Sequence, residues 1–154
     1  MSVLKFRFLV IIASIFVSTC LKAQINKSVF IELGGNGFGV SLNYETKLTN
    51  RLDNPLRLRV GAGIFPLPDS TYYLIPALVT KQFNISKLNL EYGLGIVGFY
   101  NKKSAFGYDL TGTIGAIKQF KMHYYKINFT PFLTISDKKY DFFPFLGLSY
   151  GIKI

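Results

Sequence analysis

The 154-residue sequence predicts an all-β protein, an eight-stranded antiparallel up-and-down transmembrane β-barrel that follows a cleaved signal peptide. Three observations predict this fold class. Apolar and polar residues alternate along successive segments, which is the period of a β-strand with two different faces. Short clusters of turn residues separate these segments. Hydrophobic residues make up 49% of the chain, yet after the leader no apolar run reaches the length of a membrane helix, which leaves a β-core protein or a barrel in lipid.

Residues 1–23 predict an export signal. Lys5 and Arg7 give a basic start, the apolar stretch "FLVIIASIFVSTCL" follows, and Ala23 is a small residue suited to a cleavage site. The apolar run is too short for a membrane anchor, which needs about 20 residues. We therefore expect a signal peptide at 1–23 and an outer-membrane barrel domain at 24–154.

The cysteine content and the charge limit the alternatives. The single cysteine, Cys20, lies in the leader, so no disulfide can stabilise the mature domain. Acylation at Cys20 would make the chain a lipoprotein, but the threonine before it disfavours this alternative. The formal net charge is +10. In an exported chain whose Lys and Arg residues fall mainly in turns and at strand ends, this charge favours anionic lipid head groups over nucleic acid as partner.

Turn clusters divide the mature sequence into eight expected strands. The connections between them are short, so consecutive strands should pair antiparallel as a meander. Most strands are about 10 to 13 residues long, which suits a tilted transmembrane strand better than the mean soluble strand of about 5–6 residues. In chain order, the expected strands are residues 28–35, 38–48, 56–66, 72–83, 87–100, 106–119, 123–136 and 141–153.

Each of the clearest strands has one apolar face. The alternation is strict enough to assign these faces residue by residue. In chain order they are Phe38, Val40, Leu42 and Tyr44; Leu56, Leu58, Val60, Ala62 and Ile64; Leu88, Leu90, Tyr92, Leu94 and Ile96; Tyr108, Leu110, Ile114 and Ala116; Tyr125, Ile127, Phe129, Leu133 and Ile135; and Phe142, Pro144, Leu146, Leu148, Tyr150 and Ile152.

Alternation alone does not say which face points inward, because soluble sandwiches and membrane barrels orient it oppositely. The polar faces are rich in Gly, Thr, Ser and Asn, whereas a soluble surface would carry more Lys and Glu. Small residues suit the interior of a narrow barrel. Tyrosines gather near strand ends, as in the aromatic girdles of membrane barrels: Tyr72, Tyr73, Tyr100, Tyr108, Tyr124, Tyr125 and Tyr140. We expect the apolar faces to meet lipid; a soluble periplasmic barrel of the lipocalin type is the alternative.

Six charged residues fall on the expected inner faces. Because an unpaired buried charge is very costly, and arginine can satisfy carboxylates with two hydrogen bonds, we expect a structural network that fills the lumen. A narrow ion path and a ligand-binding interior are the alternatives. Side chains mostly fill an eight-stranded barrel, which disfavours a wide pore. The residues are Glu32, Glu45, Arg57, Arg59, Glu91 and Asp109.

The sequence does not favour catalysis. A Ser–His hydrolase needs a histidine as general base, and the only histidine, His123, is expected at the periplasmic end, away from Ser86 and Ser104 in strand order. One histidine and no mature cysteine make a transition-metal site unexpected. "GGNGFG" resembles a phosphate loop but precedes a strand instead of a helix, so it predicts a hairpin turn. We expect no enzyme activity, no metal and no cofactor.

The loops that face outward carry two lysine pairs. An even number of strands places both termini in the periplasm, so the alternate connections face the cell exterior. The pairs Lys102–Lys103 and Lys138–Lys139 could contact phosphates of lipopolysaccharide. Solvated loop charge is the alternative.

The stretch "FIELGGNGFGVSLNYE" at 30–45, with the leader and the last strand, resembles small outer-membrane β-barrel proteins of Gram-negative bacteria, most closely those of the Bacteroidota type. The resemblance covers essentially the whole mature chain. It implies residence in the cell outer membrane, with outer-membrane lipids and the assembly machinery as partners, and it carries over no catalytic residue. We expect a monomer with a structural or surface-interaction role. A narrow channel, or a barrel that binds a small solute or lipid, is the alternative.

Overall fold

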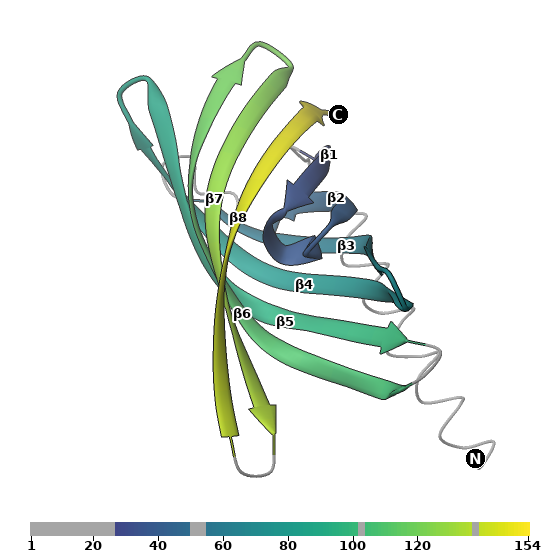
Figure 1. Cartoon of the computed structure of the whole chain (residues 1–154). Helices are drawn as coiled ribbons and strands as arrows, with labels where there is room; N and C mark the ends of the chain where they lie inside the picture. The colour runs from purple at the N-terminus through teal and green to yellow at the C-terminus, as the bar shows by residue number, and fades with distance from the viewer. Residues whose placement is uncertain (1–26, 50–54, 102–103, 137–138) are drawn as a thin grey trace, which may run out of the picture.

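The structure is a computed structural model that describes residues 27–49, 55–101, 104–136 and 139–154. Each strand pairs antiparallel with the next, and the first pairs with the last, so the sheet closes into a barrel (Figure 1). The predicted eight-stranded fold class is confirmed, whereas the expected signal peptide lies outside the described residues. The elements are β1 (Lys27–Gly34), the 3-10 turn η1 (Gly35–Gly37), β2 (Val40–Lys47), β3 (Leu56–Leu67), β4 (Ser70–Ile85), β5 (Leu88–Asn101), β6 (Ser104–Phe120), β7 (His123–Ser136) and β8 (Lys139–Lys153).

The strands place their apolar side chains on the outside of the barrel. Leu94 on β5 is 76% exposed and Leu146 on β8 is 73% exposed, whereas the polar side chains that alternate with them are buried. A water-facing surface would not carry so continuous an apolar belt. The outer surface of the barrel is therefore suited to hydrocarbon. Separately, no helix within the described ranges is both long and apolar enough to cross a membrane.

The β1–β2 connection departs from the predicted strand bounds. Phe38 was expected on the outer face at the start of the second strand, and this prediction is wrong. β2 begins at Val40, and Phe38 has a φ of 54°, outside the strand conformation. Gly34 and Gly35 also have positive φ, which glycine adopts without steric cost. The chain therefore turns into the lumen, and the Phe38 ring stacks on Phe132 of β7 at 4.1 Å between centroids.

The η1 turn reaches across the barrel. Asn36 is completely buried, and its Oδ1 accepts a hydrogen bond of 3.0 Å from Thr111 on β6, near the opposite wall. In Figure 1 the dark blue β1–β2 hairpin curls within the ring, while the β7–β8 hairpin extends well beyond it. The turn therefore partly fills the lumen instead of projecting from the rim.

The barrel wall is uneven because β1 and β2 are short. β1 pairs with β8 only as far as Gly147, although β8 begins at Lys139. β2 pairs with β3 only as far as Ile64, although β3 continues to Leu67. We call the end of the barrel beyond η1 the far mouth and the end with Lys27 and Ile154 the terminal mouth. The wall is lowest at the far mouth, directly beside η1.

The interior has two chemically different halves. Towards the far mouth, Leu74, Val97 and Phe132 form a buried apolar cluster. Phe38, Phe65, Phe99 and Phe145 pack against this cluster. The half nearer the terminal mouth holds most of the buried charged side chains, together with a smaller cluster of Phe30, Ile117 and Tyr124.

Candidate functional site

An ion network lies in the lumen around Arg59 of β3. Glu45 on β2 is its direct register partner, and the two residues face each other across the strand pair. Arg59 donates from Nε and Nη2 to Glu45 Oε2 at 3.1 and 2.7 Å. Arg59 Nη2 also donates to Glu91 Oε1 on β5 at 2.5 Å. Arg57 donates to the other Glu45 oxygen at 3.0 Å, so a single hairpin supplies two arginines to one carboxylate.

Glu91 extends the network to two further strands. Gln82 on β4, its register partner, donates to Glu91 Oε2 at 3.1 Å. Lys126 on β7 donates to Glu91 Oε1 at 3.3 Å. Lys126 was not among the six charged residues predicted for the lumen. The alternation could have identified Lys126, because this residue falls on the polar face of its strand.

Phe30 of β1 lies between the two cations of the network. The guanidinium carbon of Arg59 is 5.0 Å from the ring centroid, and Lys126 Nζ is 4.2 Å from it. Both distances suit cation–π attraction. Glu32, two residues further along β1, accepts a hydrogen bond of 3.0 Å from Asn128. The ring and this amide hold the cations and the carboxylate in fixed positions.

Asp109, the sixth predicted residue, lies apart from the network. It pairs in register with Val97, six residues beyond Glu91 along β5. Its side chain is 7% exposed, and its buried Oδ1 has no hydrogen-bond partner among the described residues. The structure therefore places all six predicted residues inside the barrel but brings only five of them into one half.

The middle of the lumen is closed to water. Arg59 is 0% exposed and Glu91 is 1% exposed, so no water-sized space reaches the centre of the network from either mouth. At the terminal mouth, a cavity of only about 20 Å³ touches Glu45, Arg57 and Tyr124. The ion network and η1 together separate this cavity from the far mouth.

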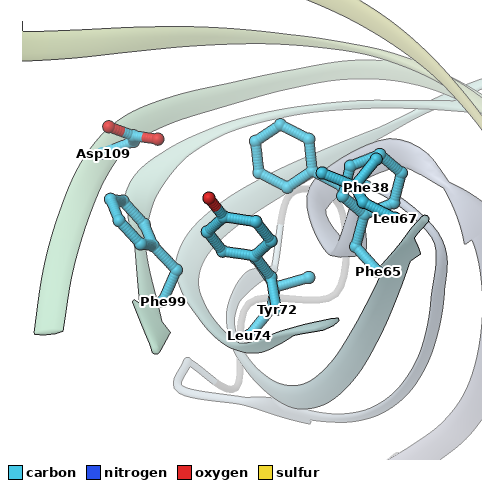
Figure 2. Close-up of a pocket in the computed structure, with 7 residues that line it drawn as sticks. All are labelled: Phe38, Phe65, Leu67, Tyr72, Leu74, Phe99 and Asp109. Atoms are coloured by element: carbon cyan, nitrogen blue, oxygen red, sulfur yellow. The ribbon is translucent and has the colours of Figure 1, made fainter. Parts of the chain in front are cut away.

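A larger pocket of about 300 Å³ occupies the far mouth. Figure 2 shows the Tyr72 hydroxyl turned toward the side where Asp109 and Phe99 lie, with Phe38, Phe65 and Leu67 grouped on the other side. This pocket was not found from the sequence, because its walls come from the η1–β2 connection and from four strands, β3 to β6, which meet only in the closed barrel. Its lining residues are Phe38, Phe65, Leu67, Tyr72, Leu74, Phe99 and Asp109.

The other predicted residues can be placed only in part. Lys102, Lys103 and Lys138 lie outside the described residues, and Lys139 opens β8 with a side chain that the structure does not describe. His123 is exposed at the start of β7, where its Nδ1 lies 2.8 Å from the Tyr150 hydroxyl.

The described part of the chain does not bring together the residues that serine or metal chemistry would need. Ser86 lies in the β4–β5 turn and Ser104 begins β6, at the end of that strand opposite to the turn that leads to His123. Among the described residues, no group of three or more His, Cys, Asp or Glu side chains is arranged to hold a metal ion.

Comparisons with known proteins support the fold alone. The sequence matches no protein-family model and no curated protein. Two solved outer-membrane barrels share the fold. The N-terminal β-barrel domain of Pseudomonas aeruginosa OprF superposes with a TM-score of 0.53 at 12% identity, covering 83% of this chain and 96% of that domain. Neisserial surface protein A gives a TM-score of 0.50 at 9% identity, covering 84% and 94%.

Proposed function

We propose that this protein is an integral outer-membrane barrel with a sealed lumen, a structural or surface-interaction role and no catalytic activity. The burial of Arg59 between Glu45 and Glu91 carries the proposal. A conducting path would have to hydrate this guanidinium, which here exchanges all contact with water for carboxylates and an aromatic ring. The closed network supports a barrel that stabilises the envelope or presents its surface, instead of one that passes solutes.

Two features of the outer surface support residence in the outer membrane. Tyr73 and Tyr100 are register partners near the far mouth, and both are exposed. Tyr125 and Tyr150 lie together near the terminal mouth, with ring centroids 5.2 Å apart. Exposed tyrosines at both ends of an apolar belt match the two interfaces of a bilayer. The shared fold of the two outer-membrane neighbours points the same way.

Planar-bilayer recording tests the sealed lumen. We expect the wild-type barrel to insert without discrete conductance steps. Steady openings of the wild-type protein would contradict the proposal and favour the narrow-channel alternative. Heat-modifiable migration of the refolded protein on gels, together with fractionation into the detergent-soluble envelope, tests membrane residence separately.

The far-mouth pocket favours a second candidate function, the binding of a small solute. Its volume of about 300 Å³ lies at the lower end of the usual range for ligand sites. It is separated from the terminal mouth by the ion network, so a ligand could bind without crossing the barrel.

The remaining expectations form part of the same proposal. We infer that the leader is cleaved after residue 23, which mass spectrometry of the mature N-terminus can test. We also infer a monomer of the Bacteroidota type, inserted by the outer-membrane assembly machinery.

We further propose that four lysines contact lipopolysaccharide. Replacing all four by alanine should weaken the association of the protein with lipopolysaccharide, and an unchanged association would contradict this proposal. The lysines are Lys102, Lys103, Lys138 and Lys139.

A further inference from the structure

We propose that the far-mouth pocket binds a small organic ammonium compound, which pairs with Asp109 and lies against the surrounding aromatic rings. The site is separate from the sealed network, and the inference rests on the second candidate function above, for which it names the class of solute. It depends on three observations: an unbalanced buried charge, an aromatic lining and an open side of the wall.

The buried charges of the described barrel do not balance. Three carboxylates and three cations belong to the network half: Glu32, Glu45, Glu91, Arg57, Arg59 and Lys126. Asp109 is the seventh buried charged side chain and adds one negative charge. No described Lys or Arg lines its pocket, and its Oδ1 has no described hydrogen-bond partner. A buried charge without a partner is costly, so among the described residues the pocket lining carries one negative charge and no cation.

The rest of the lining is suited to a cation that carries apolar groups. Four aromatic rings surround the space, from Phe38, Phe65, Tyr72 and Phe99. Phe38 and Phe65 lie 6.0 Å apart between centroids, and Tyr72 and Phe99 lie 6.4 Å apart, so the rings form two walls. Aromatic faces attract ammonium ions, and cages of such rings recognise quaternary ammonium groups.

Other ligand classes fit the lining less well. A hard metal cation such as Ca²⁺ takes six to eight oxygen ligands, whereas this pocket offers one carboxylate and the Tyr72 hydroxyl. A neutral apolar ligand would leave Asp109 unpaired. A zwitterionic lipid head group would bring a phosphate, and no described cation lines the pocket to receive it. The described lining therefore matches a free ammonium compound.

The uneven wall gives the pocket an entrance. Phe38 precedes the start of β2, and Phe65 follows Ile64, the last β3 residue that pairs with β2. Residues 139–146 of β8 also lack a β1 partner and pair with β7 alone. The wall beside Phe38 and Phe65 is therefore low, and the pocket opens at the far mouth.

Choline and its carbon isostere, 3,3-dimethylbutan-1-ol, provide a matched pair of probes, because they differ chiefly in the charge. Binding to the full-length refolded barrel can be measured by calorimetry in a maltoside detergent, whose head group carries no ammonium group to compete with choline. We expect saturable choline binding, with affinity for the alcohol lower by about tenfold or more. Phosphocholine should bind more weakly than choline, which distinguishes a free ammonium compound from a lipid head group.

Two variants and one control locate the site. Asp109→Asn should weaken choline binding by about tenfold and leave the alcohol unchanged. Phe99→Leu should weaken choline binding several-fold. This variant still tests the site if Asp109→Asn fails to refold. Asp141→Asn changes an exposed carboxylate on β8 and should bind choline like the wild type. The proposal is overturned by an absence of saturable choline binding, by equal affinity for the alcohol, or by wild-type choline affinity in both pocket variants.

Discussion

Replacement of Arg59 by methionine tests how much the buried ion network stabilises the barrel. The arginine makes three hydrogen bonds, two to Glu45 at 3.1 and 2.7 Å and one to Glu91 at 2.5 Å. Methionine is unbranched and flexible, so it can occupy part of the vacated space without a charge. The change removes all three hydrogen bonds and leaves two carboxylates with one cation fewer between them.

The magnitude follows from the partners that remain. Glu45 keeps Arg57 at 3.0 Å, and Glu91 keeps Lys126 at 3.3 Å and Gln82 at 3.1 Å. Removing one partner of a buried ion pair usually costs about 3–5 kcal/mol. Because both carboxylates retain a cation, we expect the lower end, a loss of about 3 kcal/mol in the free energy of unfolding.

Urea unfolding in lipid vesicles, followed by tyrosine fluorescence and by gel mobility, measures this loss. Lys118→Met on the exposed surface is the control and should change the stability by less than about 0.5 kcal/mol. Adding Glu91→Gln to Arg59→Met removes one of the poorly compensated charges and should recover part of the loss, which a double-mutant cycle quantifies. A loss below about 1 kcal/mol for Arg59→Met would refute the view that the network stabilises the fold.

Three further changes test other parts of the structure. Leu94→Arg places a charge at the middle of the outer face of β5 and should cost about 2–4 kcal/mol in a bilayer; an unchanged urea midpoint would mean that this face meets water. Phe38→Ala removes the ring stacked on Phe132 at 4.1 Å and should cost about 2 kcal/mol in the same titration, so wild-type stability would contradict the packing. Gly35→Ala adds a Cβ about 2.5 Å from Glu32 Oε1 at a φ of 56° and should lower the temperature of the heat-induced gel shift, by a loss of about 1 kcal/mol or more.

The strands follow from the sequence because alternation and turn residues are local signals. The fifth strand was expected at 87–100 and is found at Leu88–Asn101. The prediction for Phe38 is wrong for the same reason. A prediction from alternation holds only where the strand conformation continues, and the positive φ of Gly34 and Gly35 ends the strand before Phe38. The density of glycine in "GGNGFG" indicated a turn there, but not that the turn would fold into the lumen.

The site is less predictable, because it depends on where each inward residue lies along the barrel. Alternation placed Asp109 and Glu91 on the same face, but six residues of register separate their levels on β5, and only the strand pairing fixes that offset. Lys126 meets Glu91 across the lumen from a strand that is not its neighbour. Contacts across the lumen depend on the curvature of the barrel and on the stagger of its strands. Neither can be predicted from the sequence of a single strand.

The distribution of the charges over distant strands also constrains the order of events during assembly. Glu45 and Arg59 share one hairpin and can neutralise each other early, but Glu91 and Lys126 arrive on β5 and β7. In a flat sheet these last groups would face acyl chains, at a cost of about 2.5–3.5 kcal/mol or more for each charge. We therefore expect entry into the bilayer and closure of the sheet to proceed together, since a flat intermediate would expose Glu91 and Lys126 to hydrocarbon.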